Sequence, residues 1–178
     1  AAYHSFQEKE RNFELSGDRM KGSYLGPEFT QADIESALSS VGAKFSALED
    51  TAVVKNAAEA LASGQAVGWF QGRMEFGPRA LGGRSILADP RSAEMQQNLN
   101  LKIKHRESFR PFAPSVLRED MANWFQIDVD SPYMLLVADV TPERRLPMSP
   151  EEEKLFGIDK LNVPRSEIPA ITHVDYSA

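Results

Sequence analysis

The chain has 178 residues, of which 42% are hydrophobic and 26% are charged, and its formal net charge at pH 7 is −6. This composition is ordinary for a globular protein and excludes a wholly disordered chain, a collagen-like polymer and a coiled coil. The chain has no cysteine, so it can form neither a disulfide framework nor a thiolate zinc site.

The first 29 residues are polar and aperiodic, and glycines and a proline interrupt them. We therefore expect a linker or surface arm over residues 1–29, followed by one domain over residues 30–178. The N-terminus lacks the basic and apolar regions of a signal peptide. No stretch approaches the roughly 18 apolar residues that a membrane-spanning helix requires. These features predict a cytoplasmic protein without membrane contact.

Two helices are predicted after the arm. Thr30, with Asp33 three residues later, is a variant of the capping box, and Gly42 is a typical C-terminal stop. Thr51 is expected to cap a second helix, which Gly64 ends. Apolar residues recur at the helical period within both segments.

Short apolar runs in the rest of the chain predict strands. These runs are residues 66–71, 85–88, 115–117, 133–140 and 171–174. A further helix is expected after Ser92, with Met95 and Leu99 on one face, and a helical turn or two at residues 120–125. Residues 141–169 are acidic and contain prolines, which predicts a mobile excursion. Helices that alternate with short strands predict an α/β fold, with α+β as the alternative.

The basic residues are concentrated in the middle of the chain. Residues 71–118 carry a net charge of +5, so the remainder of the chain carries −11. An acidic protein with an arginine-rich centre is not typical of general nucleic-acid binding; this pattern favours a focused pocket for a small anion. For any single arginine, a surface ion pair is the alternative interpretation.

Residues 72–84, here called the glycine-rich loop, read GRMEFGPRALGGR and combine four glycines with three arginines. Glycine lets the backbone approach a ligand, exposed amides bind anions, and arginine suits phosphate and carboxylate. A second basic segment, residues 104–110, is here called the basic loop. Neither loop has the spacing of a P-loop or of the dinucleotide fingerprint. Together they predict phosphate or nucleotide binding, with structural ion pairing as the alternative.

The other candidate residues point to no further chemistry. The three histidines form no metal motif, so we predict no metal site. His173 lies in a predicted strand before Asp175, which favours a hydrogen bond within the sheet, and its role in a site stays open. No serine has an obvious base beside it. An enzyme built on these residues would work by positioning and charge stabilisation, as in phosphoryl or nucleotidyl transfer.

Two long strings resemble the C-terminal domain of the NodU/CmcH/TobZ family of O-carbamoyltransferases. They are GRMEFGPRALGGRSILADPR at 72–91 and NLKIKHRESFRPFAPSVL at 100–117. The resemblance implies a YrdC-like fold, a twisted mixed sheet with flanking helices and a basic concave face, incomplete at the C-terminus. It also implies that carbamoyl phosphate is activated with ATP and Mg²⁺ to carbamoyl adenylate. A separate N-terminal transferase domain would then pass the carbamoyl group to a hydroxyl acceptor.

By the same resemblance, Lys104 and Arg106 match a Lys-x-Arg motif, and we assign them the catalytic role at the phosphates. Four more arginines are expected to bind carbamoyl phosphate and ATP: Arg73, Arg79, Arg84 and Arg110. Glu75 is either a ligand of magnesium or of an ammonium-type group, or the ion-pair partner of an arginine, which is the interpretation we favour.

The resemblance also implies that this chain is a fragment. Without the transferase domain we expect it to be inactive alone, and exposed sheet edges would favour homo-oligomers. Two alternatives stay open. A YrdC-like module could bind nucleotide or RNA without catalysis, although the net negative charge disfavours nucleic acid. The arginines could also serve structure only, by pairing with carboxylates of the transferase domain.

Overall fold

The computed structural model describes Asp18 and residues 20–178. Much of the predicted arm, residues 1–17 and 19, lies outside the described residues. Among the described residues, no helix is long and apolar enough to cross a membrane.

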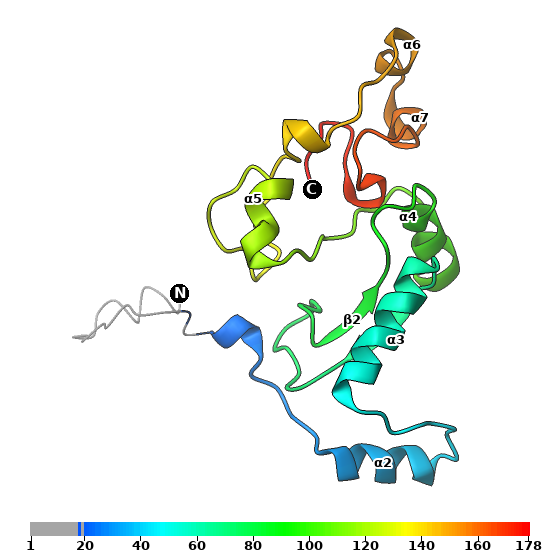
Figure 1. Cartoon of the computed structure of the whole chain (residues 1–178), viewed down its shortest axis with the longest axis vertical. Coiled ribbons are helices and arrows are strands. Elements are labelled where there is room, and N and C mark those ends of the chain that lie inside the picture. Colours follow the sequence, from blue (N-terminus) through cyan, green and yellow to red (C-terminus); the bar gives the residue numbers. More distant parts are fainter. Residues whose placement is uncertain (1–17, 19) are drawn as a thin grey trace, which may run out of the picture.

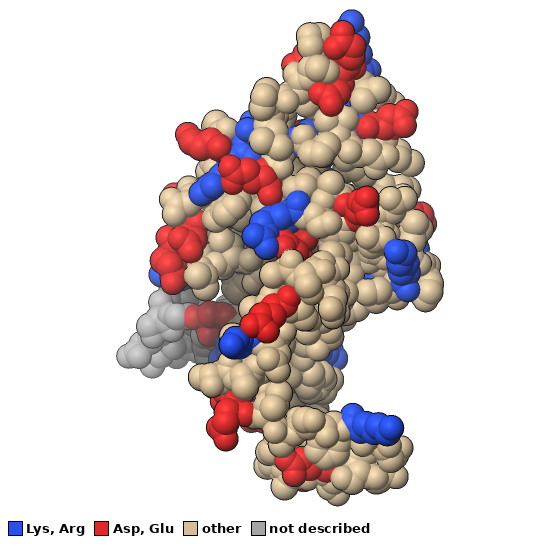
Figure 2. Space-filling view, turned by 45° about the vertical axis from the view of Figure 1, so that its right-hand side comes forward, with Lys and Arg blue, Asp and Glu red and all other residues tan. Residues whose placement is uncertain are grey.

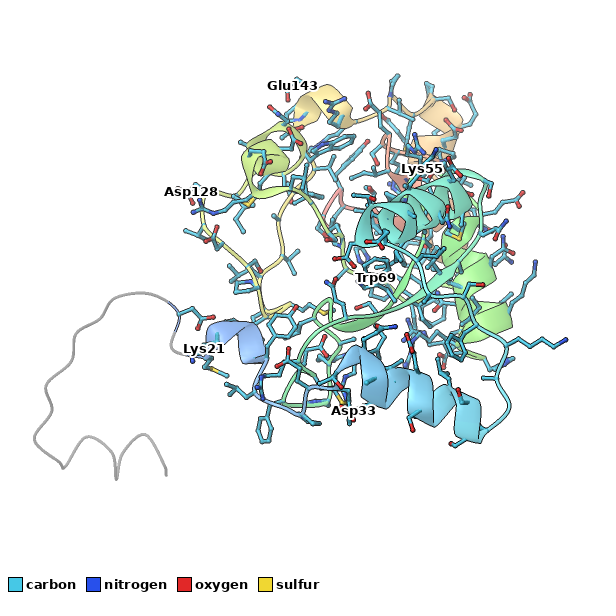
Figure 3. The ribbon with its side chains drawn as sticks, turned by 60° about the horizontal axis from the view of Figure 1, so that its bottom comes forward. Lys21, Asp33, Lys55, Trp69, Asp128 and Glu143 are labelled. Carbon is cyan, nitrogen blue, oxygen red and sulfur yellow. The ribbon has the colours of Figure 1, made fainter. Side chains whose placement is uncertain are left out.

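The molecule is elongated, with α2 (Gln31–Ser40) at one end and α6 (Pro150–Glu153) and α7 (Gly157–Leu161) at the other (Figure 1). Between them, α3 (Asp50–Ala62) lies against the first strand. A second view, in which Asp33 labels α2, again places that helix at the edge of the molecule (Figure 3). The first helix is therefore peripheral to the rest of the fold.

The predicted ends of α2 are confirmed. The Thr30 hydroxyl accepts a hydrogen bond from the Asp33 amide at 3.2 Å, and the Asp33 carboxylate accepts one from the Thr30 amide at 3.0 Å. This capping box satisfies two amides that a helix N-terminus leaves without partners. Gly42 follows the helix with a φ of +66°, a left-handed conformation that glycine adopts without steric cost.

The second predicted helix is also confirmed, but its start is not where the sequence placed it. The N-cap residue of α3 is Glu49, which makes no side-chain capping bond, and Thr51 lies inside the helix. The helix begins earlier because Asp50 already provides an acidic residue in the first turn, which favours the helix dipole. Gly64 follows the end with a φ of +81°.

Neither helix buries its apolar stripe. No residue of α2 or α3 is buried, and Val41 and Val54 are 76% and 59% exposed. An apolar stripe ordinarily marks the face that a helix packs against its neighbours. In this chain the local signals form α2 without such packing, and α3 with only partial packing against β1.

The first two predicted strands are confirmed and form a hairpin. β1 (Val67–Phe70) pairs antiparallel with β2 (Arg84–Leu87), with Val67 opposite Leu87 and Phe70 opposite Arg84. The amide of Gln71 continues the ladder by donating to the Gly83 carbonyl at 2.8 Å. The glycine-rich loop is therefore the connection of a hairpin, and Arg84 begins its second strand.

The other three predicted strands are wrong. Residues 115–117 have no regular structure, and residues 133–140 form only isolated bridges, from Val140 to Phe125 and from Asp139 to Ser177. The segment predicted at 171–174 begins instead at the end of a 3-10 helix. An apolar run forms a strand only where a neighbouring strand takes its backbone hydrogen bonds. The fold mixes helix and strand as predicted, but within the described residues its sheet has two antiparallel strands.

The helix predicted after Ser92 is present and changes type along its length. α4 (Met95–Asn98) follows Glu94 as the N-cap residue, two residues later than predicted from Ser92. It continues as the π-helix η2 (Leu99–Ile103). Met95 and Leu99 are buried as one face, as expected.

The helical turn predicted at residues 120–125 is confirmed as η3 (Arg118–Asp120) followed by α5 (Met121–Trp124). The segment 141–169 contains η4 (Pro142–Arg144), α6 and α7. Local signals account for α6, because Ser149 forms a capping box with Glu152 and a proline occupies the first turn.

The hydrophobic core lies in the C-terminal half of the chain. One cluster of buried residues contains Phe125, Val140, Ile168 and Ile171. A second contains Met95, Leu99 and Ala170, the last of which belongs to η5 (Pro169–Ile171). Phe112 packs against both clusters and joins them. The core therefore supports the basic loop, which directly precedes this phenylalanine.

Candidate functional site

The glycine-rich loop folds around the carboxylate of Glu75. This residue is only 4% exposed, and its Oε1 accepts hydrogen bonds from the amides of Leu81 and Gly83, both at 2.7 Å. A Cβ at position 83 would meet that Oε1 at 3.2 Å and the Tyr24 ring at 3.1 Å. A side chain at this position would crowd the carboxylate and the Tyr24 ring, and glycine avoids this crowding.

The remaining oxygen of Glu75 faces Arg84. The Arg84 Nε lies 3.2 Å from Oε2, which makes no hydrogen bond with correct geometry among the described residues. Burial by itself raises the pKa of Glu75. Backbone hydrogen bonds, including those from Leu81 and Gly83, and the charge of Arg84 outweigh burial, so the pKa lies below its ordinary value of 4.5. Glu75 is thus ionised at neutral pH and pairs with an arginine.

Residues ahead of α2 line this loop. The amide of Gly26 donates to the Met74 carbonyl, and the amide of Met74 donates to the Pro27 carbonyl, both at 2.9 Å. The Tyr24 hydroxyl donates to the Leu81 carbonyl at 2.7 Å. The described end of the predicted arm therefore packs on the glycine-rich loop and helps to fix its shape.

Arg84 is the most enclosed of the three arginines in the glycine-rich loop. Its Nη2 donates to the Gly77 carbonyl at 3.0 Å and to the Glu75 carbonyl at 3.3 Å, and its side chain is 31% exposed. Together with the ion pair at Nε, these bonds commit most of the guanidinium to the loop itself. Nη1 forms neither a hydrogen bond nor an ion pair with the described residues.

The other two arginines of this loop differ in the number of contacts that their guanidinium groups make with the protein. Arg73 donates to the Gly26 carbonyl at 2.7 Å and forms an ion pair with Glu28 at 3.4 Å, with its side chain 47% exposed. Arg79 is exposed, and none of the described residues forms an ion pair with it. Arg73 therefore resembles a structural side chain more than Arg79 does.

The basic loop is organised by Asn100, which the sequence analysis did not single out. Asn100 is fully buried, and its Nδ2 donates to the carbonyls of Ser108 and Arg110, both at 2.9 Å. Its Oδ1 accepts a hydrogen bond from the Nε of Arg106 at 2.6 Å. One side chain thus connects the π-helix to three positions of the loop that follows.

Two of the three predicted cations of the basic loop form no ion pair with the described residues. Arg106 lies over the Phe112 ring at 5.1 Å, and its two terminal nitrogens make no hydrogen bond to the described residues. Lys104 is exposed and forms no ion pair with the described residues. Arg110 is paired with Glu107 at 3.1 Å but remains 53% exposed. Lys104 and Arg106, like Arg79 in the glycine-rich loop, therefore have charged groups available to an anion.

The C-terminal loop, residues 160–173, is built around a second polar side chain missing from the sequence analysis. Arg165 is 1% exposed and donates to the carbonyls of Thr172 at 2.6 Å, His173 at 3.1 Å and Val163 at 2.9 Å, and also to those of Lys160 and Leu161. Burial lowers the pKa of Arg165.

His173 belongs to this C-terminal loop. Its backbone carbonyl accepts from Arg165, its amide donates to the Ser177 carbonyl at 2.9 Å, and no strand forms there. The sheet setting expected for His173 is therefore absent. Its side chain makes no hydrogen bond to the described residues.

Basic side chains are mixed with acidic ones on the molecular surface. No hydrogen bond or ion pair joins the glycine-rich loop to the basic loop within the described residues. On the face drawn in Figure 2, lysine and arginine alternate with aspartate and glutamate. The charge segregation along the sequence is therefore largely offset by neighbouring carboxylates in space.

The main cleft has a volume of about 520 Å³ and a mostly apolar lining. Its walls come from β2, α4, α5 and η5 and include Leu87, Met95, Phe112 and Trp124. None of the eight predicted site residues lines it. Anionic substrates require cationic or amide donors, so the basic loop is a better candidate for them than this cleft.

The magnesium alternative for Glu75 does not fit its surroundings. Two amides and a guanidinium hold this carboxylate, whereas magnesium prefers an octahedral set of oxygen ligands. Within residues 18 and 20–178, no three acidic or histidine side chains gather into a group that could hold a metal ion.

Comparison with known proteins adds an independent finding. Residues 58–178 match the family described as "Carbamoyltransferase C-terminus". The whole chain is 57% identical to the uncharacterized protein sll1178 of Synechocystis sp. and covers 29% of that protein. Over 90% of its length it is 42% identical to the nodulation protein NolNO of Sinorhizobium fredii, covering 21% of it.

A named enzyme is among the relatives. Over 67% of its length the chain is 42% identical to the 3'-hydroxymethylcephem-O-carbamoyltransferase of Amycolatopsis lactamdurans and covers 18% of that enzyme. The chain thus spans less than a third of the length of each of these three relatives.

Proposed function

The chain belongs to the carbamoyltransferase family, matching its C-terminal region, and from this premise we propose that it binds carbamoyl phosphate and ATP for carbamoyl activation. Relatives of the chain include nodulation proteins and an O-carbamoyltransferase that acts on a cephem. Transfer of the carbamoyl group to a hydroxyl acceptor would then fall to a separate N-terminal transferase domain. That domain is the partner we propose, with self-association as the alternative.

The observation that supports the proposal is the pair formed by Lys104 and Arg106. Arg106 offers both terminal nitrogens of a planar guanidinium, held over an aromatic ring. Lys104, two residues earlier, offers an exposed ammonium group. Two anionic substrates repel each other by about 4 kcal/mol per pair of unit charges 4 Å apart near a protein surface. Two cations at the phosphates would offset that repulsion.

The chemistry in this proposal is nucleotidyl transfer. Water first hydrolyses carbamoyl phosphate, so that the bond between carbamate and the phosphoryl group breaks and inorganic phosphate is released. A carbamate oxygen then forms a bond to the α-phosphorus of ATP, and the bond from that phosphorus to pyrophosphate breaks. Lys104 and Arg106 would hold the phosphates in line and stabilise the charge that develops on them. Magnesium would enter with the ATP phosphates rather than through Glu75.

The remaining arginines differ in how freely they could bind a substrate. Arg79 is available to a second anion. Arg73, Arg84 and Arg110 each pair with a carboxylate, so binding a substrate would require them to share that partner. A YrdC-like fold also stays a proposal. The described residues contain a two-stranded sheet, whereas a YrdC-like fold has a larger, mixed sheet.

Calorimetric titration of the 178-residue chain with carbamoyl phosphate and with ATP–magnesium tests this function. We expect saturable binding of both, weakened at least tenfold in Lys104→Ala and in Arg106→Ala, because each removes a charged donor to phosphate. Inorganic phosphate serves as the ligand control. Arg118→Ala is the matched protein control, since Arg118 is 80% exposed and pairs with Asp130. No saturable binding, or an equal loss in Arg118→Ala, would overturn the proposal.

A further inference from the structure

Asn100 occupies an unusual position for a polar side chain. It is fully buried at the second residue of the π-helix η2, whose first residue, Leu99, belongs to the core. A π-helix is rare and occurs mostly where a helix is adapted to a local requirement. Here the wider turn is followed directly by the basic loop.

Every hydrogen-bonding group of this amide is used. Nδ2 donates its two hydrogen bonds to the carbonyls of Ser108 and Arg110, and Oδ1 accepts a hydrogen bond from the Nε of Arg106. The Asn100 carbonyl also accepts from the Arg106 amide at 3.0 Å. Because a rotation of the amide would break three bonds in a buried setting, its orientation is fixed.

This fixed amide determines how Arg106 is presented. The bond to Nε holds one edge of the guanidinium, and the Phe112 ring covers one face. What remains is the pair of terminal nitrogens, which forms the fork that arginine uses for bidentate binding of phosphate and carboxylate. The neighbouring His105 has a φ of +49°, a conformation costly for a non-glycine residue, which the bonds around it maintain.

We propose that Asn100 is a positioning residue that orients the guanidinium of Arg106 for bidentate binding of a phosphate or carboxylate group. The inference deepens the proposed function and rests on it. Asn100 does not touch the ligand; it acts by removing freedom from the long side chain that does. Binding by Arg106 then requires less ordering at the moment of association.

A double-mutant cycle on affinity tests this role. Asn100→Ala should weaken carbamoyl phosphate binding about five- to tenfold, the effect expected when one long side chain regains its freedom. In an Arg106→Ala background, the same substitution should have no further effect on affinity, because the side chain that Asn100 orients is gone. A loss of affinity that persists in full in that background would overturn the proposal.

Two further variants separate positioning from folding. Arg106→Lys keeps the charge and leaves the amide of Asn100 bound to Ser108 and Arg110, yet it removes Nε and the fork. It should match the affinity loss of Asn100→Ala with a smaller loss of stability, because only one of the three hydrogen bonds of the Asn100 side chain is removed. Thr172→Val is the control for a buried polar residue elsewhere, since Thr172 is 2% exposed and bonds Ser166 and Ile168. It should lower stability and leave affinity unchanged.

A measurement made without ligand tests the positioning role of Asn100 separately from the proposed function. The Nε proton of Arg106, identified in nitrogen-edited NMR by its loss in Arg106→Lys, should exchange slowly with water in the wild-type chain and rapidly in Asn100→Ala. If the wild-type chain binds no anion, the proposed function fails while this readout still tests the positioning. If exchange is unchanged in Asn100→Ala, the positioning role is wrong.

Discussion

The two N-terminal helices and the three irregular loops of this chain are stabilised in different ways. α2 and α3 satisfy their backbones through helical hydrogen bonds and bury no residue. The glycine-rich, basic and C-terminal loops cannot pair their backbones in this way. Each instead surrounds one buried polar side chain that binds backbone groups of the loop: Glu75, Asn100 or Arg165.

The difference shows where tertiary structure has to supply what local structure does not. Backbone amides and carbonyls buried without partners are costly, so an irregular segment needs donors or acceptors from side chains. A carboxylate serves where amides converge, as at Glu75, and a guanidinium serves where carbonyls converge, as at Arg165. We therefore expect substitutions in the loops to have larger and more global effects than substitutions in the helices.

The largest effect is expected in the C-terminal loop. Arg165→Ala should lower the free energy of unfolding by about 3–5 kcal/mol, because it leaves several enclosed carbonyls without a donor. Urea denaturation measures this change. Arg118→Ala, at an exposed arginine with one ion pair, should cost less than about 1 kcal/mol. Similar losses of stability in both variants would show that the buried hydrogen bonds of Arg165 add no stability, and would contradict the role assigned to it in the C-terminal loop.

A smaller effect, dependent on pH, is expected at Glu75. Because its pKa is lowered in the folded chain, its contribution to stability is complete above the ordinary value of 4.5 and disappears as the pH falls through the folded pKa. Glu75→Gln should therefore lower the free energy of unfolding at pH 7 by about 2 kcal/mol. It should also flatten the loss of stability on acidification.

Denaturation curves at a series of pH values measure both changes. Glu59→Gln is the matched control, since Glu59 lies on α3 and its side chain is 67% exposed beside Lys55. An equal flattening in that control would contradict the role assigned to Glu75.

The smallest effect is expected at the cap of α2. Thr30→Ala should destabilise that helix by about 1 kcal/mol, because the Asp33 amide loses its bond to the Thr30 hydroxyl, and the bond from that hydroxyl to the Asp33 carboxylate is lost with it. Faster hydrogen exchange of the α2 amides should report it, while global unfolding stays unchanged because α2 buries nothing. Thr30→Ser should restore protection, and Ser36→Ala within the exposed helix should not reduce it. A lower global stability in Thr30→Ala would show that α2 is coupled to the core.

Signals that act within a few residues were sufficient to predict part of this structure. The capping box of α2, the glycines after both helices and the two strands of the hairpin were all predictable from the sequence. The glycines and arginines of the glycine-rich loop also marked it out. The assignment to a carbamoyltransferase family followed from two continuous strings and agrees with the match over residues 58–178.

Other features were decided by contacts between distant segments. Residues 133–140 have the composition of a strand, but Leu135 is 81% exposed because no neighbouring strand pairs with it. Nothing in the local sequence distinguishes Asn100 or Arg165 from exposed polar residues. Their burial arises only when the basic loop and the C-terminal loop fold around them. Local propensity therefore determined the helices and the hairpin. Which polar side chains would be buried in the loops depended instead on the backbone groups that the tertiary structure left without partners.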